Sequence, residues 1–236
     1  MKNSIDKSVK KSGADMVSLK RDFVTAGHII VHQQLADGFA HISIRLPEPE
    51  NDKMIFMPRI SPVILQEKDL FIIGFDEKVH QSSIHTAIYR ARRDAGAVIH
   101  THSPYVIALS LLGRTVEPIH NYSAFFHDGV PLYETGGQVG NQETAEKIVQ
   151  ALDTRKAIIQ KGHGAFIVGQ SVQDACLLAI FLEESAKYLL GVLSHGEPRP
   201  LSLEEARRIA EQTGKPSATA RGWDHFRFLA LRQFPL

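Results

Sequence analysis

The sequence has almost no cysteine, no long apolar run and little net charge, and each absence excludes a class of protein. Cys176 is the single cysteine among 236 residues, so an internal disulfide is impossible. We expect its thiol to be buried, because it lies in the apolar segment ACLLAIFL. No segment reaches 18 consecutive apolar residues, and residues 1–15 lack the apolar core of a signal peptide. The sequence therefore predicts a cytoplasmic protein.

The charges are nearly balanced, with 27 Lys and Arg against 26 Asp and Glu and a formal net charge of +1. This balance gives no electrostatic reason to expect nucleic acid or an anionic membrane as a partner, so we expect small molecules. The hydrophobic content of 43% and the lack of a linker-like segment indicate one large core. We predict a mobile N-terminal tail over residues 1–15 and a single domain over residues 16–236.

Two histidines at the end of an apolar strand are the central feature. Residues 97–99 read Ala-Val-Ile, and His100 and His102 follow with one threonine between them. Side chains at i and i+2 of a strand point to one face, so both rings can direct a nitrogen at the same point. Neutral imidazoles bind Zn, Mn, Fe, Co or Ni without thiols. His163, which lies between two glycines after a second apolar run, is the best candidate for a third ligand.

The alternative interpretation of a lone His-x-His pair is a surface strand with two polar side chains. The glycine-flanked third histidine, in a chain with 12 histidines, favours a metal site instead. We therefore predict that His100, His102 and His163 bind one divalent metal ion, either Mn²⁺ or Zn²⁺.

Hydrophobic periodicity and turn residues predict an alternation of helices and strands. The expected helices cover residues 16–34, 104–112, 141–152, 171–193, 203–212 and 222–234, with a further helix from residue 84. The expected strands cover residues 39–45, 53–57, 69–75, 97–99, 157–159 and 165–169. The first two strands flank a polar turn and predict a hairpin. Prolines bracket the loop that contains Arg59, which leaves this side chain available to a site.

The order of these elements resembles the class II aldolase and adducin family over roughly residues 16–230. The segment RRDAGAVIHTHS, which begins at Arg92, is the most specific part of the resemblance, and His163-Gly164 and a long helix follow it. The resemblance implies an α/β fold of three layers, α/β/α, with a largely antiparallel central sheet. It also implies a homotetramer and a divalent metal held by the three histidines.

Two departures from the family pattern concern the substrate. Aldolases of this family hold a sugar phosphate with a Gly-Asn pair and a Thr-Gly pair, whereas this chain has Ala40-His41 and Arg59-Ile60 at these places. The loss of glycine closes the backbone approach that a phosphate needs. His41 and Arg59 add side-chain donors instead, and a guanidinium pairs with a planar carboxylate through two hydrogen bonds. We therefore predict that His41 and Arg59 bind a carboxylate.

A third departure concerns proton transfer. The aldolases carry an acidic residue four positions before His85, and Gln81 at this place cannot act as an acid or base. Gln81 remains a candidate for hydrogen bonding, and His80 beside it is a candidate for proton transfer. His85 and Tyr89 lie one helical turn apart and are further catalytic candidates, although packing against the sheet would also explain them.

His225, near the C-terminus, is a candidate for closing the substrate site of a neighbouring subunit. A plain helix surface is the alternative interpretation of this residue.

A retained metal and a lost base favour decarboxylation, because loss of CO₂ forms a carbanion without a base but needs an electron sink. The resemblance extends to decarboxylases of hydroxylated aromatic dicarboxylates. The first expected substrate is 3-hydroxy-2-methylpyridine-4,5-dicarboxylate of vitamin B6 degradation, and a dihydroxyphthalate is a close competitor. A metal-dependent aldolase or epimerase acting on a non-phosphorylated hydroxy acid or sugar is the alternative. An adducin-type binding protein is disfavoured, because it would not be expected to keep three metal histidines.

Overall fold

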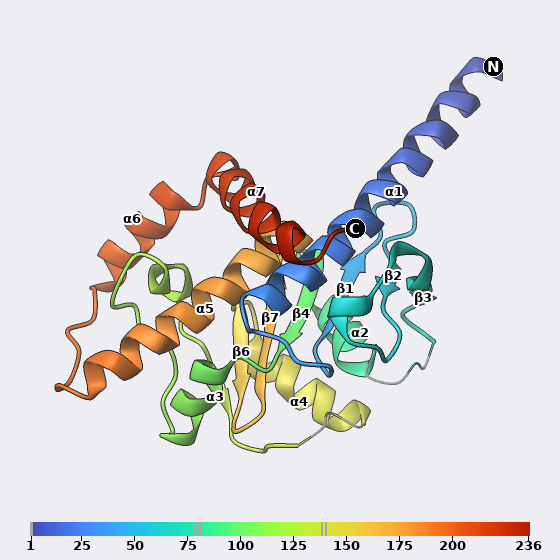
Figure 1. Cartoon of the computed structure of the whole chain (residues 1–236). Helices are drawn as coiled ribbons and strands as arrows, with labels where there is room; N and C mark the ends of the chain where they lie inside the picture. Colours follow the sequence, from blue (N-terminus) through green and yellow to red (C-terminus); the bar gives the residue numbers. More distant parts are fainter. Residues whose placement is uncertain (1, 78, 80–81, 138, 140) are drawn as a thin grey trace.

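A seven-stranded sheet forms the centre of the molecule (Figure 1). The computed structural model of the chain describes residues 2–77, 79, 82–137, 139 and 141–236, with side chains from residue 16 onward. The strands are β1 (His41–Arg45), β2 (Lys53–Phe56), β3 (Phe71–Gly74), β4 (Ala97–Thr101), β5 (Leu132–Tyr133), β6 (Ala157–Gln160) and β7 (Gly164–Gly169). Their order is β3-β2-β1-β4-β7-β6-β5, and every neighbouring pair is antiparallel except β5 with β6. The expected largely antiparallel α/β fold is confirmed.

Helices cover both faces of this sheet, which gives the three layers (Figure 1). The helices are α1 (Lys2–His32), α2 (Ser82–Ala91), α3 (Pro104–Leu111), α4 (Gln142–Leu152), α5 (Val172–Leu193), α6 (Leu203–Thr213) and α7 (Pro216–Gln233). Three short 3₁₀ turns cover Pro62–Ile64, Glu67–Asp69 and Ser123–Phe126. Helices α1, α3, α5 and α7 pack on one face, and α2 and α4 pack on the other.

Strand β4 shows why the sheet is buried on both faces. Ala97 and Ile99 belong to the apolar cluster that contains α1 and α5, whereas Val98 belongs to the cluster with α2 and α4. Because side chains of a strand alternate between faces, His100 shares the face of Val98. The metal-binding face predicted from the sequence is therefore the face covered by α2 and α4.

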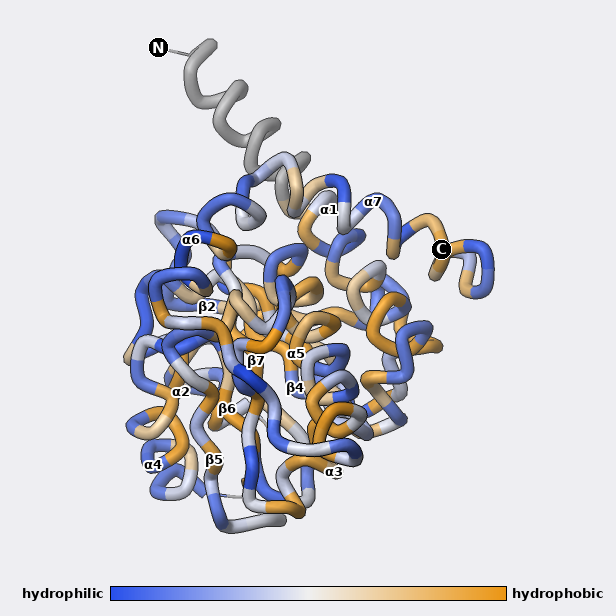
Figure 2. The backbone as a smooth tube through the Cα atoms, turned by 90° about the vertical axis from the view of Figure 1, so that its left-hand side faces the viewer, coloured by the Kyte–Doolittle hydropathy of each residue, from blue (hydrophilic) through white to orange (hydrophobic). Residues whose placement is uncertain are grey.

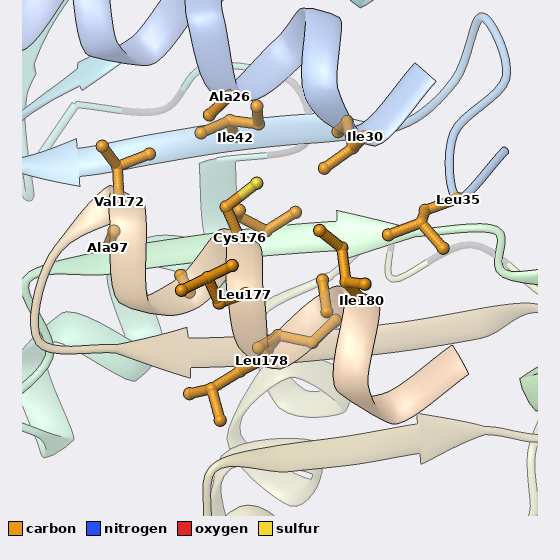
Figure 3. Close-up of a cluster of buried hydrophobic side chains, with 14 of the residues drawn as sticks. Ala26, Ile30, Leu35, Ile42, Ala97, Val172, Cys176, Leu177, Leu178 and Ile180 are labelled. Atoms are coloured by element: carbon orange, nitrogen blue, oxygen red, sulfur yellow. The ribbon is translucent and has the colours of Figure 1, made fainter. Parts of the chain in front are cut away.

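Helix α5 is the most deeply buried helix of the larger cluster, as its apolar composition predicted. Cys176 on α5 is fully buried, and Figure 3 shows it among apolar side chains such as Ile42 of β1 and Leu177. Burial raises the pKa of this thiol. The expected burial of this cysteine is confirmed.

Several element boundaries differ from the expected ones by a few residues, and three differences are larger. Helix α1 begins at Lys2, so residues 2–15 are helical, and the mobility that we expected for the N-terminal segment stays a prediction. Helix α7 begins at Pro216 rather than at residue 222, because proline is well tolerated in the first turn of a helix. Strand β5 was not expected, since only two residues pair with β6 and so short a segment has no detectable periodicity.

The hydropathy of the chain follows this layered arrangement. Figure 2 shows apolar residues concentrated on the strands and on the inward sides of the helices, with hydrophilic residues outside. In the part of the chain that the structure describes, no helix is long and apolar enough to cross a membrane.

Candidate active site and metal centre

One cavity of about 740 Å³ opens beside the ends of β1 and β4. Among the described residues, thirteen polar side chains line it. Six of them are His41, Arg59, Thr86, His100, His102 and His163, and the others are Asp76, Glu77, Ser82, Ser83, Arg90, Asn141 and Gln142. The aromatic rings of Phe39 and Phe166 also line it. The structure thus brings together residues that are widely separated in the sequence, and five of these six polar residues were predicted as site residues.

The three histidines predicted as metal ligands form one cluster. One ligand atom from each of His100, His102 and His163 lies within 4.8 Å of the others, and the Nε2 atoms of His100 and His102 are 3.0 Å apart. Gly164 allows this approach, because a Cβ atom there would lie 1.9 Å from the carbonyl oxygen of Thr101. A side chain at position 164 would therefore push His163 away from the other two rings.

The second ring nitrogen of each histidine has a hydrogen-bond acceptor. Nδ1 of His100 donates to the carbonyl oxygen of Ala165 at 3.0 Å. Nδ1 of His102 donates to the carboxylate of Asp37, with 2.9 Å to Oδ2. These acceptors place the proton on Nδ1, so in the neutral rings both Nε2 atoms present lone pairs.

His163 follows the same pattern. Its Nδ1 lies 2.9 Å from the carbonyl oxygen of Gly137 and 2.9 Å from Oε1 of Gln160. Three lone pairs thus face one point, and two of them are only 3.0 Å apart. A divalent cation satisfies such a donor set, and the outer acceptors resemble those that orient metal-binding histidines.

Burial keeps His100 and His163 in the neutral form that binds metal. Burial, followed by the neighbouring imidazoles of His41, His102 and His163, lowers the pKa of His100 well below its usual value of 6.5. Burial and His102 lower the pKa of His163 in the same direction. The unprotonated rings are therefore the dominant form at neutral pH.

A string of four buried polar side chains runs away from the cavity behind His41. Nδ1 of His41 lies 2.6 Å from Nε2 of His85, and Nδ1 of His85 lies 2.6 Å from Oγ of Ser43. The same Oγ lies 2.8 Å from the hydroxyl of Tyr89. His85 and Tyr89 are fully buried and do not line the cavity, whereas His41 does. The two predicted catalytic residues of α2 therefore reach the cavity only through His41.

The other predicted site residues have three different placements. Arg59 is exposed and lines the cavity from the loop after β2, as the prolines around it indicated. His225 is exposed on α7 and is not among the residues that line the cavity of this chain. His80 and Gln81 lie outside the described residues.

Sequence reasoning missed several residues that hold the site together. Asp37 contacts His102 and Ser43 contacts His85, and in both pairs the partners lie far apart in the sequence. Gln160 contacts His163, which lies only three positions later. Thr86, a buried residue of α2, also lines the cavity, and its hydroxyl has no hydrogen-bond partner in the described part of the chain. An Asp-Gly turn before β1 was the only available signal for Asp37.

The carboxylate of Glu183 binds the N-terminus of α3, which lies beside His102. Both carboxylate oxygens of Glu183 accept hydrogen bonds from backbone amides, from Tyr105 at 2.9 Å and from Val106 at 2.9 Å. The positive end of this helix is thus neutralised by the protein itself.

Comparison with known proteins identifies the class. Residues 21–190 match the family model described as Class II Aldolase and Adducin N-terminal domain. The chain therefore belongs to the class II aldolase and adducin family, as its histidine motif indicated. The solved structure of an L-fuculose 1-phosphate aldolase from Glaciozyma antarctica PI12 superposes with a TM-score of 0.80, covering 94% of this chain and 92% of that chain at 23% identity. This likeness establishes the fold.

Two curated relatives show the range of activities in the neighbourhood of this chain. A 3,4-dihydroxyphthalate decarboxylase from Arthrobacter keyseri is 29% identical over 72% of this chain and 77% of its own length. A 5-methylthioribulose-1-phosphate/5-deoxyribulose-1-phosphate aldolase from Rhodospirillum rubrum is 30% identical over 54% of this chain and 58% of its own length. Both names describe enzymes that cleave carbon–carbon bonds, so the comparisons support a lyase.

Proposed function

We propose that the protein is a metal-dependent decarboxylase of a hydroxylated aromatic dicarboxylate. The observation that carries the proposal is that Arg59 and the three-histidine cluster line one cavity. An anion-binding guanidinium beside a candidate metal centre suits a substrate that carries both a carboxylate to be held and a group to be activated.

His100, His102 and His163 would hold the metal, because their Nδ1 atoms are engaged elsewhere and their Nε2 atoms face one another. A divalent ion at this place supplies an electron sink that stabilises the negative charge left by departing CO₂. Neutral imidazoles without a thiolate suit Mn²⁺ or Zn²⁺.

Part of the remaining wall fits an aromatic dicarboxylate, and of the two acidic side chains that also line the cavity, Asp76 is paired with Arg90. Arg59 pairs with one carboxylate, and His41 donates a further hydrogen bond. Phe39 and Phe166 supply apolar surface on which a flat ring can pack. The hydroxyl of Thr86, buried at the cavity wall, is available to a substituent of the ring.

The carbanion must receive a proton after CO₂ leaves. We propose His80 and Gln81 as the residues of this step, His80 as donor and Gln81 as a hydrogen-bonding group. His85 and Tyr89 act on the cavity only through His41, because neither side chain lines it. We further propose a homotetramer in the cytoplasm, in which exposed His225 on α7 contributes to the substrate site of a neighbouring subunit.

Two substrates deserve the first assays. The name of the Arthrobacter relative gives 3,4-dihydroxyphthalate, and our interpretation of the sequence gives 3-hydroxy-2-methylpyridine-4,5-dicarboxylate of vitamin B6 degradation. Both rings carry a hydroxyl and two carboxylates. We propose the pyridine as substrate on the sequence pattern, while the relative favours the benzene ring.

The test is release of CO₂ from each compound by the purified protein with added Mn²⁺ or Zn²⁺. We expect turnover of at least one compound, with strict dependence on added metal after chelation. Absence of CO₂ release from both compounds and from related ortho-hydroxy dicarboxylates would reject the proposal.

A metal-dependent aldolase or epimerase is the second candidate, favoured by the aldolase name of the Rhodospirillum relative. Hydrogen–deuterium exchange at a carbon beside a carbonyl distinguishes the two, because an aldolase removes a proton to start its reaction and a decarboxylase does not. A Gln81→Glu variant sharpens the comparison. It should lower decarboxylation through repulsion of the anionic substrate, whereas an aldolase would gain a base.

A further inference from the structure

Tyr89, Ser43, His85 and His41 form a string of buried, hydrogen-bonded side chains. The donor and the acceptor of each bond can be assigned in turn, starting from Tyr89. Tyr89 is fully buried, so its hydroxyl proton needs an acceptor. Oγ of Ser43 lies 2.8 Å away. The other polar groups that act on the phenol are the backbone amides of Val98 and Arg45 and the Arg45 guanidinium, all of which only donate. Tyr89 therefore donates to Ser43.

The number of protons on each group then fixes the donor and the acceptor of the next two bonds. A serine hydroxyl has one proton, and Nδ1 of His85, at 2.6 Å, is the acceptor for it among the described residues once Tyr89 donates to Ser43. Burial lowers the pKa of His85 to about 3, so its ring is neutral and carries its single proton on Nε2. This Nε2 group donates to Nδ1 of His41 at 2.6 Å. With Nδ1 acting as acceptor, neutral His41 carries its proton on Nε2.

We infer that Ser43, acting through His85, holds His41 in the tautomer protonated on Nε2. A protonated nitrogen has no lone pair for a metal, although the ring of His41 is centred only 4.6 Å from the ring of His100. His41 therefore stays outside the metal ligand set and donates a hydrogen bond to a substrate oxygen. Ser43 is a positioning residue, since it does not line the cavity.

The opposite set of hydrogen-bond directions has a higher free energy. If His41 donated from Nδ1, His85 would donate from its own Nδ1 to Ser43, whose oxygen can accept from His85 and from Tyr89 at once. Either the Ser43 proton or the Tyr89 proton would then have no acceptor among the described residues, at a cost typical of a buried unsatisfied donor. A serine proton outside the cavity thus favours one tautomer of a cavity residue.

The direct test is the ¹⁵N NMR spectrum of histidine rings in protein loaded with diamagnetic Zn²⁺. His41 is assigned by the signals that disappear in a His41→Gln variant. We expect the wild type to show a pyridine-type Nδ1 and a protonated Nε2 at His41. A protonated Nδ1 on His41 would overturn the inference.

Variants of the string test its direction. Ser43→Ala should give a mixture of His41 tautomers, and Ser43→Thr, which keeps the hydroxyl, should keep the wild-type spectrum. Tyr89→Phe should also keep it, because Ser43 retains its proton and Nδ1 of His85 remains the acceptor. Ser185→Ala is the matched control, because Ser185 is a buried serine that bonds to Phe181 on α5. An unchanged His41 spectrum in Ser43→Ala would reject the role of Ser43. If Ser43→Ala does not fold, the wild-type spectrum decides, because a protonated Nδ1 on His41 overturns the inference.

The substrate part of the inference rests on the proposed function, and it is measured separately. Ser43→Ala should keep full Zn²⁺ occupancy, raise KM for the dicarboxylate about two- to tenfold and change kcat less, as expected for one hydrogen bond. Mixed tautomers with an unchanged KM would reject donation to the substrate. The expected spectrum in a protein that releases no CO₂ would reject the proposed function and support the tautomer.

Discussion

Asp37 accepts a hydrogen bond from Nδ1 of His102 across 65 positions of the chain, with 2.9 Å between Nδ1 and Oδ2. Although partial burial raises the pKa of Asp37, the hydrogen bonds from His102 and from the Phe39 amide outweigh it and lower the pKa overall. The carboxylate is thus ionised at neutral pH and holds the His102 ring with Nε2 toward His100. This contact orients one metal ligand of the proposed centre.

Removal of this contact should weaken metal binding without removing a ligand. We expect Asp37→Ala to reduce the affinity for Zn²⁺ or Mn²⁺ about 10- to 100-fold, the typical effect of losing an outer-shell carboxylate. Competition with a chelator measures the affinity. Asp52→Ala is the control, because Asp52 is exposed and lies outside the cavity lining. Equal affinities in the two variants would contradict the orienting role.

Loss of a ligand itself should be more severe. His102→Ala should lose most of its bound metal, because a pair of histidines holds a divalent ion much less tightly than three. Elemental analysis after gel filtration measures occupancy, and His195→Ala, which changes an exposed histidine after α5, should keep it. Full occupancy in His102→Ala would exclude His102 as a ligand.

The two glycines Gly164 and Gly191 should respond to alanine in opposite ways. In Gly164→Ala the new Cβ would lie 1.9 Å from the carbonyl oxygen of Thr101, so β4 and β7 must separate and His163 must move. We expect lower thermal stability and weaker metal binding. Gly191 lies in α5 with no atom within 4 Å of a new Cβ, so Gly191→Ala should stabilise the helix by about 0.5–1 kcal/mol. Thermal unfolding and chelator competition on both variants check this contrast.

Arg59 should contribute mainly to substrate binding. We expect Arg59→Ala to weaken dicarboxylate binding by about 1.5–3 kcal/mol, or roughly 10- to 150-fold, as for a hydrogen bond to a charged group. Arg59→Lys should rescue only part of this loss, because a lysine lacks the planar pair of donors. Calorimetric titration of the metal-loaded protein measures the affinity for the dicarboxylate. Arg208→Ala, which changes an exposed arginine on α6, is the control. Wild-type affinity in both Arg59 variants would remove Arg59 from the site.

The buried imidazole of His85 should make stability depend on pH. Burial lowers its pKa from 6.5 to about 3, so between these values the unfolded chain binds a proton that the folded chain does not. The unfolding free energy must then fall as the pH falls through this window, by up to about 1.4 kcal/mol per pH unit. Denaturant unfolding of metal-free protein at several pH values measures the slope. His85→Asn should show a shallower slope, and an identical slope would contradict a neutral buried His85.

Local patterns account for the parts of the site that the sequence predicted. His100 and His102 share a face because a strand has a period of two residues, and this holds whatever the strand packs against. Arg59 reaches the cavity from a loop whose prolines keep it irregular. The long helix α5 follows from a continuous apolar segment. Each of these properties depends on neighbours along the chain, so it can be predicted before the fold is known.

Long-range pairing accounts for what the sequence could not indicate. The register of β1 against β4 places His41 opposite His100, and the packing of α2 on that face brings His85 and Tyr89 to Ser43. As a result, two residues that looked catalytic on a helical face lie behind the cavity wall. No periodicity encodes such contacts, because they depend on which strands become neighbours.

The sequence by itself determined the family, the layered fold and the three histidines of the proposed metal centre. Only the tertiary structure decided that Asp37 orients His102, that Glu183 occupies the N-terminus of α3, and that His41 is held from behind by a buried string. The physical reason is that ligand spacing is a local property of a strand. The proton positions on those ligands are set by acceptors that folding brings from distant parts of the chain.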